Sequence, residues 1–131
     1  MAEPASVTPQ GEVYDWYVRG LRLLDAGNPA AAAQLLTHAA NAEPHARSVR
    51  EALARAQYGS GRYSDAQQNF ELIVETNPID DYAHFGAGLS AARAGDYRGA
   101  VGHLALAAAL RPENRHYSTA LRGARARLDA G

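Results

Sequence analysis

Five histidines are the residues of this sequence best suited to bind a metal ion or to transfer a proton. They are His38, His45, His84, His103 and His116. No two of them stand four positions apart, the spacing that places two ligands on one face of a helix, and no acidic residue frames such a pair. The chain has no cysteine, which excludes thiolate zinc sites and cysteine nucleophiles. We therefore expect surface or half-buried histidines and no bound metal.

Two further patterns resemble parts of catalytic sites. The adjacent Asp80 and Asp81 could form a carboxylate dyad, but acidic residues at the start of a helix also cap free N–H groups and oppose the helix dipole. Gly86 and Gly88 resemble a fragment of a phosphate-binding loop, yet they fall inside a predicted helix and follow no strand, which favours close helix packing. The sequence contains no recognisable nucleophile motif, so we predict a non-enzymatic protein without a cofactor.

Charge gives little support for a polyanion partner. The formal net charge is −1 and the isoelectric point is about 6.5. Arginines do gather near the C-terminus: Arg111, Arg115, Arg122, Arg125 and Arg127. Because Glu113 and Asp129 dilute that cluster and only Tyr117 could stack on a base, we expect a solvated helix face and no nucleic-acid binding.

Neither a secretory leader nor a membrane span is evident. Residues 1–10 lack a basic start followed by an apolar run. The most apolar stretch, residues 100–110, is far shorter than the roughly 20 residues that a membrane span requires. A cytoplasmic protein without membrane contact is the resulting expectation.

Several residue types recur at a spacing of 34 positions, which indicates an internal repeat. The recurring residues are Pro44, Pro78 and Pro112; Gly27, Gly61 and Gly95; and Ala32, Ala66 and Ala100. A glycine can adopt the left-handed conformation that ends a helix, and the following Asn28 or Asp96 can cap the next helix, which Pro29 would begin. A proline then ends that second helix. The sequence therefore predicts three helix–turn–helix repeats and an all-α fold.

This pattern resembles the tetratricopeptide repeat (TPR) family. The residues that match the family positions are, in the first repeat, Trp16, Gly20, Leu23, Gly27, Ala32, Leu36, Ala39 and Pro44; in the second, Leu53, Ala54, Gly61, Tyr63, Ala66, Phe70 and Pro78; and in the third, Gly88, Gly95, Tyr97, Ala100, Leu104, Ala107 and Pro112. The resemblance implies a right-handed superhelix of seven helices, an α-solenoid.

The repeats span residues 13–46, 47–80 and 81–114. An amphipathic capping helix follows at residues 115–128, with apolar residues at Tyr117, Ala120, Leu121, Ala124 and Leu128. Residues 1–8 are expected to be a disordered tail, and residues 9–131 a single domain. The sequence departs from the family where Arg50 and His84 replace the aromatic residue of Trp16, and where Gln57 and Ala91 replace Leu23. We expect these changes to loosen the packing of the second and third repeats.

The resemblance also implies that the first helix of each pair lines a concave groove that binds a partner. The predicted groove residues are Tyr14, Tyr17, Leu21 and Leu24; Ser48, Glu51, Arg55 and Tyr58; and Tyr82, Phe85, Leu89 and Arg93. His116 and Thr119 of the capping helix would extend the groove. Five of the nine Tyr and Phe residues of the chain fall in this set, and such aromatic surfaces are typical of interaction sites.

Some TPR proteins grip the C-terminal carboxylate of chaperones with a Lys and Asn clamp. Tyr17, Leu21 and Ala52 occupy clamp positions in this chain, so the clamp is absent. The sequence favours an adaptor that binds an amphipathic helix or an extended apolar peptide of an unknown partner protein. A self-associating module that uses the same groove is the alternative, as a homodimer in place of a monomer. An RNA-binding helical repeat is a third reading, disfavoured by the near-neutral charge of the groove.

Overall fold

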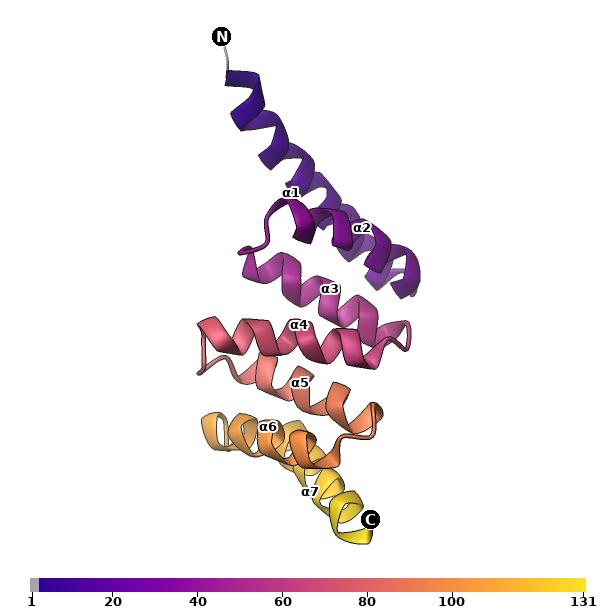
Figure 1. Ribbon diagram of the computed structural model, residues 1–131, viewed down its shortest axis with the longest axis vertical. Helices are drawn as coiled ribbons and strands as arrows, with labels where there is room; N and C mark the ends of the chain where they lie inside the picture. The colour runs from indigo at the N-terminus through magenta and orange to yellow at the C-terminus, as the bar shows by residue number, and fades with distance from the viewer. Residues whose placement is uncertain (1–2) are drawn as a thin grey trace. The chain divides into compact units, whose positions relative to one another are not determined.

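The chain is helical throughout the part that the structure describes. A computed structural model describes the backbone of residues 3–131 and the side chains from Gly11 onward. This part forms seven helices and no strand (Figure 1). The helices are α1 (Glu3–Asp25), α2 (Pro29–Ala42), α3 (Arg47–Gly59), α4 (Tyr63–Thr76), α5 (Asp81–Arg93), α6 (Tyr97–Leu110) and α7 (Arg115–Ala130). The predicted all-α class and the seven helices are confirmed, and the right-handed superhelix stays a prediction.

The chain divides into two compact units. Unit 1 is Met1–Gly61 and contains α1, α2 and α3; unit 2 is Arg62–Gly131 and contains α4 to α7. The boundary falls in the turn between α3 and α4, which are the two helices of the second predicted repeat. The single domain predicted from residue 9 onward stays a prediction.

The N-terminal helix differs from the expectation of a disordered tail. α1 begins at Glu3, so the segment from residue 3 to residue 8 is helical. Residues 1 and 2, which belong to the same predicted tail, lie outside the described residues. The prediction relied on Pro9 as a starting point for the helix, but a proline is tolerated in the first turn of a helix and kinks rather than forbids a longer one.

Glycines end the first helix of each pair, as the spacing predicts. Gly27, Gly61 and Gly95 have φ angles of 79°, 84° and 90°, a backbone conformation that is costly for residues with a side chain. At Gly27, the N–H donates to the carbonyl of Leu24 at 3.0 Å, and the Asn28 N–H donates to that of Leu23 at 2.8 Å. These two bonds form a Schellman motif, which satisfies carbonyls that the end of a helix leaves open.

Polar side chains begin the next helices, again as predicted. Asn28 caps α2, whose first residue is Pro29, and the Asp96 carboxylate caps α6 by accepting from the Gly99 N–H at 2.9 Å. Asn114 caps α7 through two backbone N–H groups. α2, α4 and α6 each end two residues before a proline of the repeat. Local chemistry therefore sets the boundaries of the helices.

Unit 1 has an alanine-rich core in which α2 packs against both α1 and α3. Leu36 of α2 is fully buried, together with several alanines of the same helix. A side chain added at Gly20 of α1 would come within 2.6 Å of Leu36, so only glycine allows this approach. Trp16 packs against the same core and contacts the ring of His38, with ring centres 6.0 Å apart.

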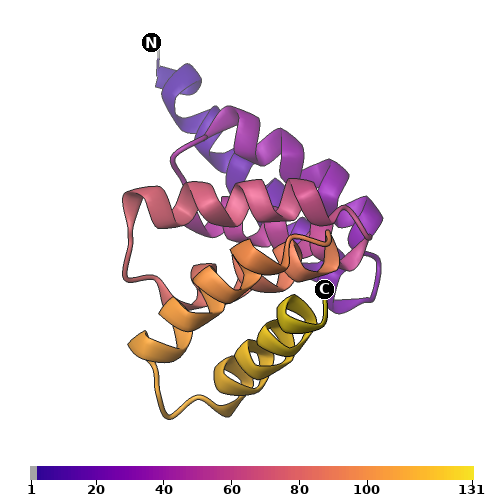
Figure 2. The ribbon, with the colours of Figure 1, turned by 60° about the horizontal axis from the view of Figure 1, so that its bottom comes forward.

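Unit 2 repeats this arrangement and adds a helix. In Figure 2, α6 and α7 form a hairpin. Leu121 and Ala124 of α7 are buried in the same core cluster as Leu104. A Cβ at Gly88 would come within 2.6 Å of Leu104, and one at Gly86 within 2.5 Å of Phe70. The two glycines are therefore close-packing positions, as the sequence predicts, and the phosphate-loop reading does not hold.

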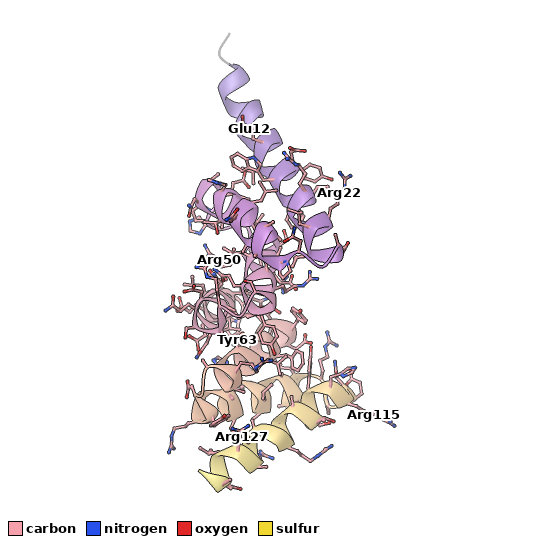
Figure 3. All side chains as sticks on the ribbon, turned by 90° about the vertical axis from the view of Figure 1, so that its right-hand side faces the viewer. Glu12, Arg22, Arg50, Tyr63, Arg115 and Arg127 are labelled. Atoms are coloured by element: carbon pink, nitrogen blue, oxygen red, sulfur yellow. The ribbon has the colours of Figure 1, made fainter. Side chains whose placement is uncertain are left out.

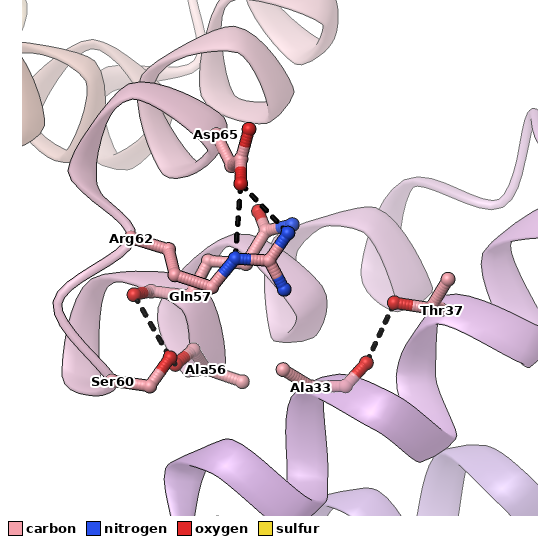
Figure 4. Close-up of polar contacts among 7 residues, drawn as sticks. All are labelled: Ala33, Thr37, Ala56, Gln57, Ser60, Arg62 and Asp65. Atoms are coloured by element: carbon pink, nitrogen blue, oxygen red, sulfur yellow. Dashed lines mark hydrogen bonds and ion pairs between the residues drawn. The ribbon is translucent and has the colours of Figure 1, made fainter.

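Short-range hydrogen bonds support the individual helices. Figure 4 shows the Thr37 hydroxyl donating to the carbonyl of Ala33 at 2.7 Å and the Ser60 hydroxyl donating to that of Ala56 at 2.9 Å. In unit 2, the Arg62 Nε donates to Asp65 at 3.0 Å in the first turn of α4. Such contacts fix helix ends but bring no distant residues together.

Candidate functional site

In unit 1, the predicted groove residues differ in exposure. Tyr14 of α1 is 69% exposed. Tyr17, Leu21 and Leu24 of the same helix are half-buried, because they pack against the core of unit 1. On α3, Arg55 and Ser48 are exposed, whereas Glu51 and Tyr58 are partly buried. The face therefore combines an exposed tyrosine with apolar side chains that also stabilise the unit.

In unit 2, the predicted groove residues of α5 belong to an aromatic cluster. Tyr82 is 37% exposed, and its ring lies 6.2 Å from that of Phe70 and 6.4 Å from that of Phe85. The Phe85 ring in turn lies 4.7 Å from that of Tyr117 on α7. Leu89 is half-buried and Arg93 is exposed on the same helix. We call the four rings of Phe70, Tyr82, Phe85 and Tyr117 the aromatic cluster.

Tyr117 was predicted on the apolar side of the capping helix, but its contacts with α5 were not predicted. Its hydroxyl donates a hydrogen bond to Asp81 Oδ2 at 2.6 Å, and Arg111 Nε donates to Asp81 Oδ1 at 3.5 Å. His116 and Thr119, the α7 residues that the prediction did assign to the groove, are exposed. A tyrosine among the apolar residues of an amphipathic helix was the available signal, because a buried hydroxyl needs a partner.

This contact has an electrostatic consequence. The hydrogen bond from Tyr117 lowers the pKa of Asp81; burial opposes that shift and the positive charge of Arg111 adds to it. Burial, reinforced by the Asp81 carboxylate, raises the pKa of Tyr117 above its usual range. Asp81 is therefore ionised, and Tyr117 holds its proton, throughout the neutral pH range.

Asp80 and Asp81 have separate roles. The Asp80 carboxylate caps α5 by accepting from the Ala83 N–H at 3.1 Å, which confirms the capping interpretation for that residue. Asp81 instead joins α5 to α7 through Tyr117. Two carboxylates bound to different partners in this way do not form a dyad that could share a proton.

Two of the charged groove residues already have partners within their own unit. Arg93 donates to the hydroxyl of Tyr63 at 2.6 Å, and its guanidinium group lies 4.6 Å from the centre of that ring. Glu51 accepts a short hydrogen bond from Arg47 one turn earlier on α3. A partner that used either charge would therefore have to displace or share an existing contact.

His84 and His103, which were not predicted to be neighbours, lie in contact within unit 2. Their Nδ1 atoms are 3.2 Å apart, and His84 is only 5% exposed. The expectation that His84 would loosen the packing of the third repeat is wrong, because this ring is buried and hydrogen-bonded. Ala91, the other departure in that repeat, is also fully buried. Among the side chains described from Gly11 onward, no group of three or more His, Asp or Glu residues is arranged to hold a metal ion.

The arginines of α7 lie mostly on its outer side. Figure 3 labels Arg115 and Arg127 near opposite ends of this helix. Arg127 covers the ring of Tyr97 at 4.8 Å, and Arg111 contacts Asp81. Arg115, Arg122 and Arg125 are exposed, as a solvated helix face would be. None of the helices between residues 3 and 131 combines the length and apolar character that a membrane crossing would need.

The family model described as tetratricopeptide repeat matches residues 23–87 of the chain, a segment that runs from the end of α1 into α5. The chain is a TPR protein. No curated protein matches it.

Solved TPR structures share the fold of this TPR chain at low sequence identity. The second TPR domain of human RPAP3, solved with the HSP70 peptide SGPTIEEVD, is 17% identical, with 89% of this chain and 98% of that chain covered and a TM-score of 0.82. The Sgt2 TPR domain from Aspergillus fumigatus is 19% identical, with coverage of 90% and 80% and a TM-score of 0.80. MamA from Desulfovibrio magneticus RS-1 is 20% identical, with coverage of 89% and 66% and a TM-score of 0.85.

Proposed function

We propose that this chain is a protein-interaction module that binds a peptide or a helix of a partner protein through the aromatic residues of its first helices. The observation that carries the proposal is the exposure of Tyr14 in unit 1 and of Tyr82 in unit 2, each beside half-buried apolar side chains of the same helix. Tyrosine supplies a large contact area at a low cost in conformational entropy, and its hydroxyl adds a polar tip.

The relatives in this fold support a peptide as the ligand. The RPAP3 domain was solved with a chaperone peptide that ends in an acidic EEVD sequence. This chain has Tyr17, Leu21 and Ala52 at the positions where the carboxylate clamp would need polar side chains. We therefore propose an apolar or amphipathic segment as the ligand, with contacts that run along the helix face and do not depend on a terminal carboxylate.

The proposal is tested with a phage-displayed peptide library selected against the wild-type chain. Recovered peptides are then measured against Tyr14→Ala, Tyr82→Ala and the control Leu106→Ala. Leu106 is a suitable control because it is 50% exposed on α6, a second helix of its pair, outside the proposed face. We expect at least one tyrosine variant to weaken binding about 30-fold, the size of a typical hot spot of 2 kcal/mol.

Circular dichroism of each variant checks that the helices remain intact. Peptides that bind both tyrosine variants as tightly as the wild type, or that lose affinity only in Leu106→Ala, would assign the interaction to another surface.

A further inference from the structure

The contact between His84 of α5 and His103 of α6 has the geometry of a nearly linear hydrogen bond. The two Nδ1 atoms are 3.2 Å apart, and the ring centres are 5.5 Å apart. The second distance exceeds the first by about twice the distance from a ring centre to its own nitrogen, so both Nδ1 atoms lie close to the line between the rings. A near-linear N···N contact of this length is what an N–H donor and a nitrogen acceptor form.

The outer nitrogens of both rings face groups that can only accept. His84 Nε2 lies 2.8 Å from the carbonyl oxygen of Pro78. His103 Nε2 lies 3.1 Å from Glu71 Oε2, which also accepts from the Gln67 amide at 3.1 Å. A carbonyl or a carboxylate oxygen offers no hydrogen, so each Nε2 must carry one.

These two requirements fix the number of protons. If each ring held only its Nε2 proton, two lone pairs would face each other at 3.2 Å. If both rings were doubly protonated, two N–H groups would collide on the same line. We propose that His84 and His103 hold one shared proton between their Nδ1 atoms, so that the pair carries three ring protons and one positive charge, and that this makes the stability of unit 2 greatest near pH 6.5.

A carboxylate in contact with the pair favours a positive charge there. On α4, Glu71 contacts His103 directly. On α5, the backbone carbonyl of Asp80 accepts from the His84 N–H at 3.1 Å, while its carboxylate caps the helix. Asp81 follows and is held by Tyr117 of α7 and by Arg111. On α6, Arg98 lies five positions before His103, and Asp96 caps the start of the helix.

A metal ion in place of the proton does not fit this geometry. Zinc lies about 2.0–2.1 Å from a histidine nitrogen, in the direction of its lone pair, and binds its ligands at the corners of a tetrahedron. Two rings that shared such an ion would be aimed at a point beside the line between them. His84 and His103 are instead aimed at each other, which leaves room on that line for a proton alone.

The dependence on pH follows from comparing bound protons in the folded and unfolded chains. An unfolded histidine is half protonated at about pH 6.5, so two of them hold about four ring protons well below that pH and about two well above it. The folded pair holds three. At low pH the unfolded chain binds one proton more and stability rises with pH; at high pH it binds one fewer and stability falls as pH rises. The unfolding equilibrium constant changes by up to tenfold per pH unit on either side.

Nitrogen NMR of the chain labelled with ¹⁵N-histidine counts the protons directly. We expect both Nε2 atoms of the pair to be protonated from pH 5.5 to 7.5, with the two Nδ1 signals showing a proton shared between them. His116, exposed on α7, is the internal control. Independent titration of His84 and His103 would overturn the proposal, as would two unprotonated Nδ1 atoms at pH 6.5 or a shift of both Nδ1 signals on adding one equivalent of Zn²⁺.

A pair of variants tests the effect on stability. The unfolding equilibrium of the wild type, of His103→Gln and of the control His116→Gln is measured between pH 5 and pH 8. We expect the ratio of the unfolding constants of His103→Gln and the wild type to fall by up to tenfold per pH unit above about pH 6.5, because only the folded wild type then holds the extra proton. The corresponding ratio for His116→Gln should change little. A flat ratio for His103→Gln, or the same curve for both variants, would contradict the shared proton.

Discussion

In unit 1, two ion pairs stay within single helices, whereas in unit 2 polar contacts also join one helix to another. Arg19 pairs with Asp15 and Arg47 with Glu51, each within one helix. In unit 2, Tyr117 reaches Asp81 across 36 positions and His103 reaches Glu71 across 32. The two units share a repeat and its glycines but not their polar contacts.

The position of Trp16 shows how this difference arose. In unit 1 the tryptophan fills space against the core with an apolar ring. Two repeats later the same position holds His84, which is too small and too polar to replace that ring and is instead hydrogen-bonded at both nitrogens. A family position can thus change from apolar packing to hydrogen bonding and remain buried, because every polar atom placed there found a partner.

The largest expected effects test what the units have in common. Leu36→Ala in unit 1 and Leu104→Ala in unit 2 each remove a fully buried leucine, so each should lower the free energy of unfolding by about 2–5 kcal/mol. Amide hydrogen exchange, read separately in α2 and α6, measures the two costs. If one cost falls within about 2–5 kcal/mol and the other falls outside it, the apolar cores of the two units are not equivalent.

Gly88 faces Leu104, and its substitution tests how closely α5 and α6 approach. Gly88→Ala alone should cost about 1–3 kcal/mol, because the new Cβ would meet Leu104. Combined with Leu104→Ala, the same change should cost little, since the methyl group then enters the space that the leucine left. Strictly additive costs would contradict the close approach of α5 and α6.

A smaller effect is expected from a contact that only unit 2 has. Tyr117→Phe removes the hydroxyl that bonds to the ionised Asp81 and should cost about 1.5–3 kcal/mol at neutral pH. Because the folded pKa of Asp81 is lowered, this stability is present above the unfolded value of about 3.9 and is lost as the pH falls through the folded pKa. Urea unfolding of the wild type and of Tyr117→Phe at pH 7 and pH 3 measures this stability. The difference between their free energies of unfolding should be smaller at pH 3. A constant difference would assign the cost to packing.

The smallest effect is expected from the local ion pairs of unit 1. Arg19→Ala breaks a contact in which both side chains are more than half exposed, so the free energy of unfolding should change by no more than about 0.5 kcal/mol. Urea unfolding at low and high salt measures this change. A loss as large as that of Tyr117→Phe would remove the contrast between the two units.

Much of the fold could be predicted because its determinants are local. Gly27 and Gly95 end helices by a backbone conformation that the residue type itself allows, and Asn28 and Asp96 cap the following helices with their own side chains. These signals act over three or four residues, so they can be recognised directly in the 34-residue sequence repeat. The start of α1 was missed because nothing in residues 3–8 stands at a repeat position.

The candidate site was less predictable because its contacts depend on which helices become neighbours. Tyr14 and Tyr82 are both exposed, and the sequence predicted both as groove residues. The bond from Tyr117 to Asp81 needs α5 beside α7, and the contact of His84 with His103 needs a particular rotation of α5 against α6. Spacing along one helix carries no information about either.

Within each unit, helices that are neighbours in sequence pack against one another, and this order bears on how the unit folds. Contacts between neighbours in sequence give a low contact order, for which folding times of microseconds to milliseconds are typical. Folding can start at any hairpin and spread to the next. The hydrogen bond between Tyr117 and Asp81 spans more of the chain than a single hairpin. We therefore expect it to form last when unit 2 folds and to slow the unfolding of that unit.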